Sequence, residues 1–148
     1  MANQALEFFQ ANIGQTFAQS PSPLSRWLGG ILLQAEEGML EASFVVREEM
    51  TNPMGTLHGG TISAICDDLI GATTFTLGRE YFYTSINLNV DFLASARLGE
   101  TVIAKATLVR AGQTIIHADC TLRDAEGKLL AKAASNLMRV NVPIKKAD

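Results

Sequence analysis

The most regular hydrophobic pattern in this chain runs from residue 61 to residue 77, where bulky apolar side chains recur at spacings of three and four. This periodicity predicts a helix that packs one broad face against a large apolar surface. Gly78 follows directly and is expected to end the helix. On a helical wheel Asp67 and Asp68 fall on opposite flanks of the apolar stripe, which consists mainly of Ile62, Ile65, Cys66, Leu69 and Ile70.

Apolar residues at helical spacing also predict an amphipathic helix over residues 3–19. We expect the segment 20–23 to end this helix, because its two prolines cannot continue the helical hydrogen-bond ladder. Next, apolar runs predict two strands, at residues 31–33 and 40–46, joined as a hairpin by a turn at 36–38.

Beyond Gly78 the pattern indicates strands only, over residues 85–92, 101–110, 114–123 and 129–142. In the first of them an apolar row of Ile86, Leu88, Val90 and Phe92 alternates with a polar row that begins at Ser85. The tail, residues 143–148, is expected to be frayed.

The predicted order is one helix, two strands, a long helix and four strands. A sheet of six strands must wrap around the long helix, since that helix has a broad apolar stripe to bury. This is the architecture of the hotdog fold, an α+β class. At 148 residues the chain is predicted to form one such domain, with an N-terminal helix and a proline-rich connection before it.

Composition narrows the functional classes. With 47% hydrophobic and 18% charged residues, the chain is not expected to be disordered. A net charge of −3 and the absence of a basic run argue against nucleic acid as a partner. No apolar segment reaches the roughly 18 residues of a membrane span, and the N-terminus lacks the features of a signal peptide. We therefore expect a cytoplasmic protein in which Cys66 and Cys120 are reduced core residues.

The segment 52–60, Asn-Pro-Met-Gly-Thr-Leu-His-Gly-Gly, places a polar, glycine-rich loop directly before the long helix. A helix N-terminus has unpaired backbone N–H groups and a partial positive charge, which suit an oxygen that gains negative charge. A carboxylate inside a helix is costly unless it has a partner or a task. A carboxylate that activates water, together with such an N-terminus, would make a minimal hydrolytic site.

Asn52 lies six residues before His58, a Gly-Gly pair follows the histidine, and Asp67 lies nine residues after it. This combination closely resembles the signature of hotdog-fold acyl-CoA thioesterases of the phenylacetate-pathway (PaaI-like) type, and the resemblance extends over residues 29–142. It implies hydrolysis of an acyl-CoA substrate without a cofactor. It also implies a homo-oligomer, at least a dimer and commonly a tetramer built from two dimers.

Carried over residue by residue, the resemblance implies a role for each catalytic residue. The backbone N–H of Gly59 would stabilise the oxyanion that develops on the thioester carbonyl, and the side chain of Asn52 would polarise the same centre. Asp67 would act as general base or nucleophile, from the helix of the opposing subunit. Ser85 would help to hold the attacking water, and His58 would shape the site beside the thioester sulfur.

The resemblance also indicates substrate-binding residues. Gly60, with Gly59, would let the thioester carbonyl approach closely. Asp68 stands where many relatives have Asn, Ala or Glu, so this chain has two adjacent acids. The segment 110–113 resembles the hairpin that holds the CoA nucleotide; because Gln113 replaces a basic residue common in relatives, Arg110 is the expected phosphate contact.

Other interpretations stay open at this stage. The chain could be a non-catalytic hotdog protein that binds acyl-CoA or fatty acids, although such a protein would not need both the asparagine and the carboxylate. It could also be a hotdog dehydratase or hydratase, which needs a histidine and an acid poised together. Asn52 could be a turn residue, and His58 could simply cap structure. A metal site is not expected, because the two histidines and two cysteines lack ligand spacing.

Overall fold

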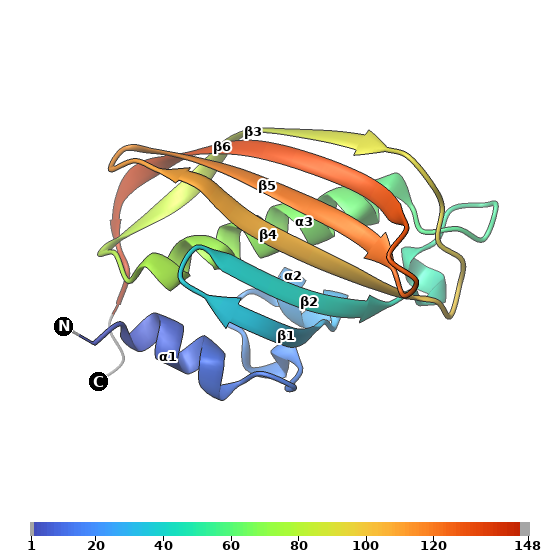
Figure 1. Cartoon of the computed structure of the whole chain (residues 1–148), viewed down its shortest axis with the longest axis horizontal. Helices are drawn as coiled ribbons and strands as arrows, with labels where there is room; N and C mark the ends of the chain where they lie inside the picture. The colour runs from blue at the N-terminus through green and yellow to red at the C-terminus, as the bar shows by residue number, and fades with distance from the viewer. Residues whose placement is uncertain (1, 146–148) are drawn as a thin grey trace.

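In the computed structural model, which describes residues 2–145, one antiparallel sheet of six strands curves around a long central helix (Figure 1). The helices are α1 (Gln4–Ala11), α2 (Pro23–Leu28) and α3 (Gly59–Thr74), and the strands are β1 (Ile31–Glu36), β2 (Met39–Val45), β3 (Tyr81–Phe92), β4 (Thr101–Ala111), β5 (Ile115–Asp124) and β6 (Leu129–Pro143). Three short 3-10 helices are η1 (Phe17–Gln19), η2 (Glu48–Met50) and η3 (Phe75–Leu77). This arrangement is the hotdog fold that the hydrophobic pattern predicts.

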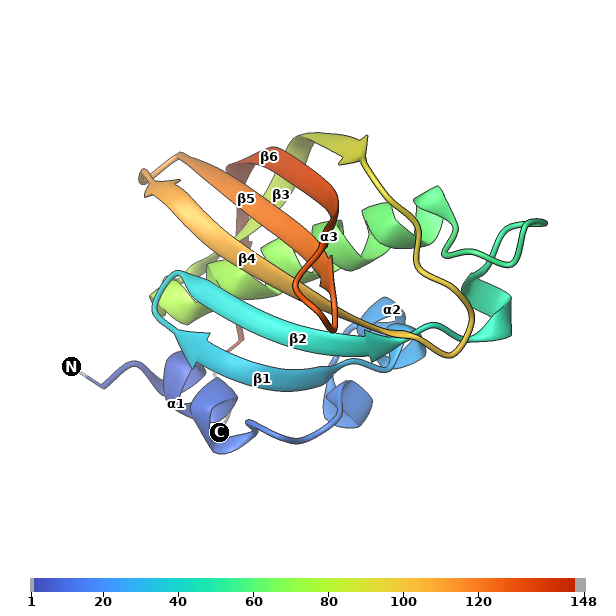
Figure 2. The same cartoon turned by 45° about the vertical axis from the view of Figure 1, so that its right-hand side comes forward.

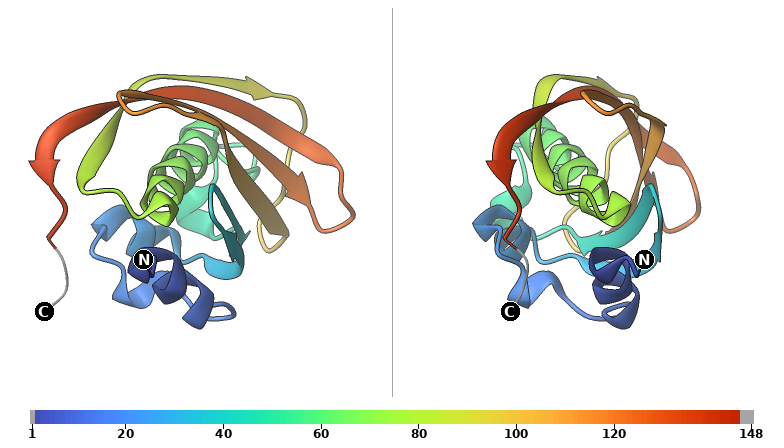
Figure 3. Two further views of the ribbon diagram at one scale, coloured as in Figure 1. Left: turned by 60° about the vertical axis from the view of Figure 1, so that its left-hand side comes forward. Right: turned by 90° about the vertical axis from the view of Figure 1, so that its left-hand side faces the viewer.

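The strands pair in the order β1-β2-β4-β5-β6-β3, so β1 and β3 form the two edges of the sheet. Turned views show the sheet arching over α3, with the N-terminal helices on the other side of α3 (Figures 2 and 3). The core lies between the concave face of the sheet and the apolar stripe of α3. Its fully buried members come from both layers and include Ile65, Cys66, Ile70, Leu40, Ala104, Ile116, Cys120 and Leu122.

The predicted long helix is confirmed, with two refinements at its ends. It begins at Gly59 because His58 is the N-cap residue, whose ring nitrogen accepts a hydrogen bond from the N–H of Gly60. Its last turn tightens into η3, and Gly78 then adopts a left-handed conformation with φ of 66°. That conformation suits glycine, because a side chain would be strained there.

The prediction of a single N-terminal helix over residues 3–19 is wrong. The helix ends at Ala11, and Gly14 has φ of 86°, which turns the chain back toward β1. The proline-rich segment also does more than end a helix. Pro23 occupies the first turn of α2, where its missing N–H has no cost, and the Ser22 hydroxyl caps that helix by accepting a hydrogen bond from the N–H of Ser25.

The edge strand β3 differs from the prediction in its start and in its faces. It begins four residues earlier, at Tyr81, and a bulge lies between Ser85 and Asn87. The bulge changes the alternation, so Ser85 points toward α3 rather than lying in the polar outer row. Ile86, expected in the inward row, sits at the bulge and is 56% exposed, and Phe92 at the strand end is 55% exposed.

Other expectations concern the ends, the cysteines and the membrane. The tail was predicted to fray from residue 143, but β6 includes Pro143 and the N–H of Ile144 donates to the carbonyl of Glu80; residues 146–148 lie outside the described residues.

Cys66 and Cys120 are free and buried, as predicted. Contact with Cys66, together with burial, raises the pKa of the Cys120 thiol well above its ordinary value of 9.0. No helix within residues 2–145 is long and apolar enough to cross a membrane.

Candidate functional site

The loop before α3 is organised by the side chain of Asn52. Its Oδ1 accepts hydrogen bonds from the backbone N–H groups of Met54 and Thr56, at 3.0 and 3.2 Å. Its Nδ2 donates to the Oγ1 of Thr56 at 2.8 Å. An amide Nδ2 carries two N–H groups, so one of them is left for another acceptor. Asn52 therefore holds the loop as a turn residue and keeps one donor at the edge of the site.

His58 joins this loop to α3. Its Nδ1 accepts a hydrogen bond from the N–H of Gly60 at 2.8 Å, so in the neutral ring the proton resides on Nε2. A Cβ on Gly60 would lie 3.1 Å from the same nitrogen, which explains why a glycine fits there. The structure thus shows a capping role for His58, and the Gly60 N–H is engaged by the ring.

Gly59 is the first residue of α3, and its N–H has no acceptor within hydrogen-bonding distance among residues 2–145. It faces a small pocket of about 180 Å³ whose wall includes Asn52, Leu57, Ile62 and Phe92. The ring of Phe92 lies over Gly59, at 3.3 Å from the position that a Cβ would occupy. The pocket therefore places a free N–H at the positive end of the helix dipole, beside the amide of Asn52.

The structure brings Asp67 and Ser85 together. The Ser85 hydroxyl on β3 donates to Oδ1 of Asp67 on α3 at 2.9 Å, and Asp67 is half-buried. Asp67 is not part of the pocket wall at Gly59. Gly59 and Asp67 are eight positions apart, which corresponds to about 12 Å along a helix axis. One copy of the chain thus presents the free N–H and the carboxylate at two separate places.

Asp68 lies on the other flank of α3, where it faces α2. Its two carboxylate oxygens accept hydrogen bonds from the hydroxyls of Ser25, at 2.6 Å, and Ser22, at 3.4 Å. Burial raises the pKa of the Asp68 carboxyl above its ordinary value of 3.8; the two serine hydrogen bonds oppose this effect, and the Asp67 charge adds to it. The structure places Asp68 in the contact between α2 and α3 rather than beside Ser85, the partner of Asp67.

The hairpin residue Arg110 is exposed on β4, where it is paired with His117 of β5. The neighbours of His117 along β5, Ile116 and Ala118, are buried, so His117 and its cross-strand partner belong to the convex face of the sheet, away from α3. His117 is held there by Asn136, which lies 2.8 Å from its Nδ1. Arg110 is therefore not brought together with the other site residues predicted from the sequence.

Two residues of the site were not anticipated. Thr56 completes the Asn52 turn, and Phe92 covers Gly59. A signal existed for the turn itself, because an asparagine side chain commonly bonds the backbone two residues further along, as Asn52 does with the N–H of Met54. Within residues 2–145 no three His, Cys, Asp or Glu side chains are placed to hold a metal ion.

Comparison with known proteins gives three findings. Residues 54–131 match the family model described as the thioesterase superfamily. Human acyl-coenzyme A thioesterase 13 is 32% identical over 109 residues, which cover 72% of this chain and 78% of that protein. Among solved structures, the PaaI protein of the phenylacetic acid degradation operon of E. coli matches with a TM-score of 0.82 over 95% of this chain and 99% of that chain. At 18% identity, this last likeness shows the fold alone.

Another solved structure is more similar in sequence to this chain than the E. coli PaaI protein is. A putative thioesterase from Ralstonia eutropha, described as related to phenylacetic acid degradation, is 29% identical with a TM-score of 0.74. The match covers 88% of this chain and 98% of that chain.

Proposed function

Because this chain belongs to the thioesterase superfamily, we propose that it hydrolyses an acyl-CoA thioester to the free acid and CoA. The observation that carries the proposal is the free N–H of Gly59 at the start of α3, together with the Asp67 carboxylate that is presented on the same helix. These are the two groups that thioester hydrolysis needs. The enzyme is proposed to be a cytoplasmic homo-oligomer.

The Gly59 N–H is proposed to donate to the thioester carbonyl oxygen. When water attacks the carbonyl carbon, that oxygen becomes an oxyanion, and the helix dipole and the remaining N–H of Asn52 stabilise it together with Gly59. Removal of one such donor typically lowers the rate by about 10²–10³. A thioester has a good leaving group, so the site needs no histidine-activated serine.

Asp67 is proposed to act as general base on the attacking water, which the Ser85 hydroxyl helps to hold. The carboxylate takes a proton from water as the new C–O bond forms, and the tetrahedral intermediate then collapses with cleavage of the C–S bond. The thiolate of CoA leaves and takes up a proton. General base catalysis of this kind contributes typically about 10²–10⁴ to the rate.

The separation of these groups supports a site shared between two copies. The roughly 12 Å between Gly59 and Asp67 along α3 is too far for both to act on one carbonyl carbon. A second copy that pairs through the edge strand β3 would bring its own Asp67 to the Gly59 pocket, since Ser85 and Asp67 lie at that edge. We propose a dimer as the minimal active unit, and a pair of dimers as the full assembly.

A dehydratase or hydratase is less well supported. That chemistry needs a histidine and an acid that act together on neighbouring carbons. Here Nδ1 of His58 accepts a hydrogen bond from the Gly60 N–H, and the ring serves as the N-cap of α3.

The proposal is tested by two substitutions at Gly59, of which one keeps the backbone N–H and the other removes it. Gly59→Ala adds a Cβ near Phe92 but keeps the N–H, whereas Gly59→Pro adds a ring and removes the N–H. Proline is well tolerated at the first helical position, and His58 already has the extended conformation that a following proline needs, with φ of −64° and ψ of 137°.

We expect the kcat of Gly59→Pro for an acyl-CoA substrate to be lower than that of Gly59→Ala by a factor of about 10²–10³. The two variants should have similar melting temperatures. Free-thiol release and thermal melts measure this. Equal kcat values in two folded variants would overturn the role proposed for the Gly59 N–H.

A further inference from the structure

Of the twelve glycines in the chain, Gly71 is the one whose missing side chain the fold itself does not explain. Seven others have a positive φ, a conformation that favours glycine. Four more have an atom at 3.3 Å or less from the position that a Cβ would occupy, namely Gly30, Gly59, Gly60 and Gly112. Gly71 has a helical backbone, and apart from the adjoining helix backbone no atom of residues 2–145 lies within 4 Å of that position.

The place of Gly71 in α3 makes this absence informative. A glycine in the interior of a helix is unfavourable, because its flexible backbone must be ordered and it adds no side chain to pack. The helical conformation continues beyond Gly71 through η3 to Leu77, so the position is an interior one. An alanine would meet no neighbour there and would favour the helix. The packing of the chain thus gives no reason for the glycine, whereas a molecule that approaches α3 at this point would.

Gly71 lies beside the proposed general base. It follows Asp67 by four residues, which is one turn and about 6 Å along the axis of α3. Asp67 and Gly71 are both half-buried, while Ile62, Ile65 and Leu69 on the opposite side of the helix are buried in the core. The two residues therefore share the face of α3 that points away from the sheet.

We infer that Gly71 determines specificity in the proposed thioesterase, because its missing side chain makes room for an apolar acyl group that extends from the thioester carbonyl toward Phe75. The inference rests on the proposed function, since it takes Asp67 as the base that delivers water to the carbonyl carbon. In a site shared between two copies, Gly71 belongs to the copy that supplies Asp67.

The face of α3 beyond Gly71 suits an apolar group. One turn further along, this face carries Phe75, whose ring meets the ring of Phe82 edge to face with the ring centres 5.6 Å apart. Phe82 remains 37% exposed. An acyl group that follows this face thus has an aromatic pair at its far end, about 12 Å along the helix axis from Asp67.

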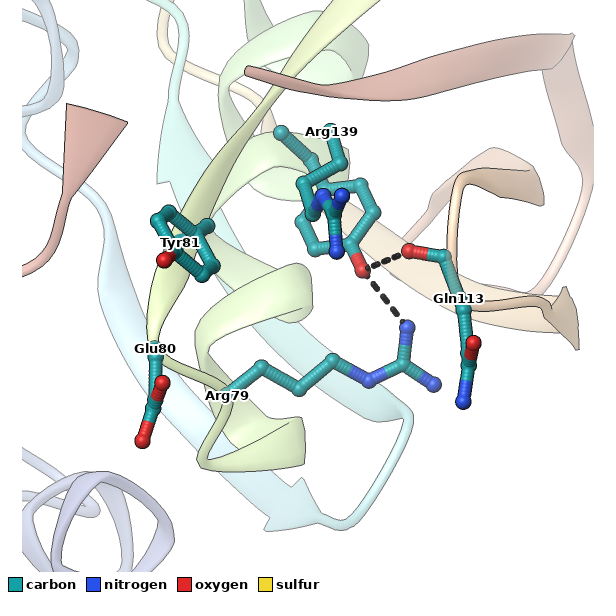
Figure 4. Close-up of a pocket in the computed structure, with 6 residues that line it drawn as sticks. Arg79, Glu80, Tyr81, Gln113 and Arg139 are labelled. Atoms are coloured by element: carbon teal, nitrogen blue, oxygen red, sulfur yellow. Dashed lines mark hydrogen bonds between the residues drawn. The ribbon is translucent and has the colours of Figure 1, made fainter. Parts of the chain in front are cut away.

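Polar side chains at this end of the molecule gather elsewhere. An open pocket of about 450 Å³ is lined by Arg79, Glu80, Tyr81, Tyr83, Gln113 and Arg139 (Figure 4). Neither Gly71 nor Phe75 belongs to that lining. The carbonyl carbon carries the acyl group on one side and the sulfur of CoA on the other. The arm behind that sulfur contains amides that need hydrogen-bond partners, which the row from Gly71 to Phe75 does not offer, so the acyl group is the one that lies over Gly71.

The test measures specificity as well as activity. Acetyl-CoA and hexanoyl-CoA share the CoA and differ only in the length of the acyl group. We expect Gly71→Leu to lower the ratio of kcat/KM for hexanoyl-CoA to that for acetyl-CoA roughly 10- to 100-fold, and Gly71→Ala to lower it by less. Both new residues favour a helix over glycine, so both variants should fold, and Gly71→Ala should melt about 2–4 °C above the wild type.

The matched control is Ala64→Leu, which adds bulk to the same face of α3 on the other side of Asp67. It should change the specificity ratio by less than about twofold, because the acyl group runs toward Phe75. A larger fall in Ala64→Leu than in Gly71→Leu would overturn the inference, since the acyl group would then run in the opposite direction.

Three further results would also overturn it. An unchanged ratio in Gly71→Leu would show that the acyl group does not pass Gly71, and an equal loss with both thioesters would place the CoA arm there. A smaller mass of Gly71→Leu in light scattering would show that the glycine makes room for the partner subunit. Absence of thiol release from both thioesters in the wild type is a different result, which refutes the proposed function and with it the role of Gly71.

Discussion

At the scale of single residues, two adjacent carboxylates on α3 have different surroundings. Asp67 receives one hydrogen bond, from Ser85 at the sheet edge, and is otherwise available to water. Asp68 receives hydrogen bonds from the hydroxyls of two serines, Ser22 and Ser25, and is half-buried beside them. The helical spacing already placed them on opposite flanks, and the structure shows that one flank faces Ser85 of β3 and the other faces α2.

We therefore expect Asp67→Asn to lower kcat by about 10² or more, because the amide cannot accept a proton from water. The matched variant Asp68→Asn should stay within about tenfold of the wild type, since Asp68 makes only a structural contact. Steady-state kinetics with one acyl-CoA substrate, alongside thermal melts, measure both effects. A larger loss in Asp68→Asn than in Asp67→Asn would show that the wrong acid has been assigned.

A second prediction concerns Asn52, whose side chain has both a structural and a proposed catalytic role. Asn52→Asp keeps the oxygen that accepts from Met54 and Thr56, but it replaces the Nδ2 donor with an anionic oxygen. We expect a kcat loss of about 10²–10³ in this variant with a nearly unchanged melting temperature. Asn52→Ala should lower both, because the loop loses its hydrogen bonds. Wild-type turnover in Asn52→Asp would mean that the amide serves only the turn.

At the scale of elements, Asp68 and two serines attach the short helix α2 to α3. Because burial raises the Asp68 pKa in the folded protein, the folded state binds a proton there more tightly than the unfolded chain does. Between the unfolded pKa near 3.8 and the raised folded value, stability contributed by this group falls as the pH rises. Above the folded pKa this decrease in stability is complete, and below the unfolded pKa no decrease has occurred.

Asp68→Asn removes this titration and keeps a side chain that can bond Ser25. We thus expect the stability of Asp68→Asn relative to the wild type to increase as the pH rises from below 3.8, and to level off above the folded pKa. Urea unfolding of both proteins across this range measures the difference, in which the other carboxyl groups cancel. A difference independent of pH would contradict the raised pKa.

Some of the helices and strands could be predicted from the sequence, and others could not. The helix α3 and the central strands follow from periodicity, because burial on one face imposes spacings of three and four on a helix and alternation on a strand. The α2 helix escaped prediction because Pro23 stops one helix and starts another equally well. The bulge after Ser85 escaped because an edge strand with one neighbour has few buried positions to fix its register.

The candidate site, too, could be predicted from the sequence only in part. Gly59 and its loop could be located because a helix start, a turn residue and a glycine pair are close in the sequence. The Asp67–Ser85 contact joins positions 18 residues apart, and only the family resemblance suggested it.

At the scale of the whole molecule, β3 is the least covered element. It pairs with β6 on one side only, and most of its side chains are exposed. Apolar exposure continues past its end at Leu93, which is 58% exposed. A long edge with unpaired backbone groups and apolar side chains is suited to pair with a second copy of itself. Such pairing agrees with the separation of Gly59 from Asp67 in one chain.

A mixing experiment tests this shared site directly. Gly59→Pro and Asp67→Asn are each expected to be nearly inactive as homodimers, because every site lacks one group. In a mixed dimer one site would receive Gly59 from one subunit and an intact Asp67 from the other, while the second site would lack both. Random reassociation makes half of the dimers mixed, so the mixture should recover about a quarter of the wild-type activity.

The recovery should require subunit exchange, so the two proteins are refolded together, and a sample refolded separately and then combined at low temperature is the control. Light scattering at micromolar concentration should give at least the mass of a dimer. Recovered activity is the decisive result, because no arrangement that keeps Gly59 and Asp67 within one chain can produce an intact site from these two variants. If the co-refolded mixture stays as inactive as its components, the catalytic carboxylate does not come from the partner, and the roughly 12 Å along α3 must be bridged within one subunit.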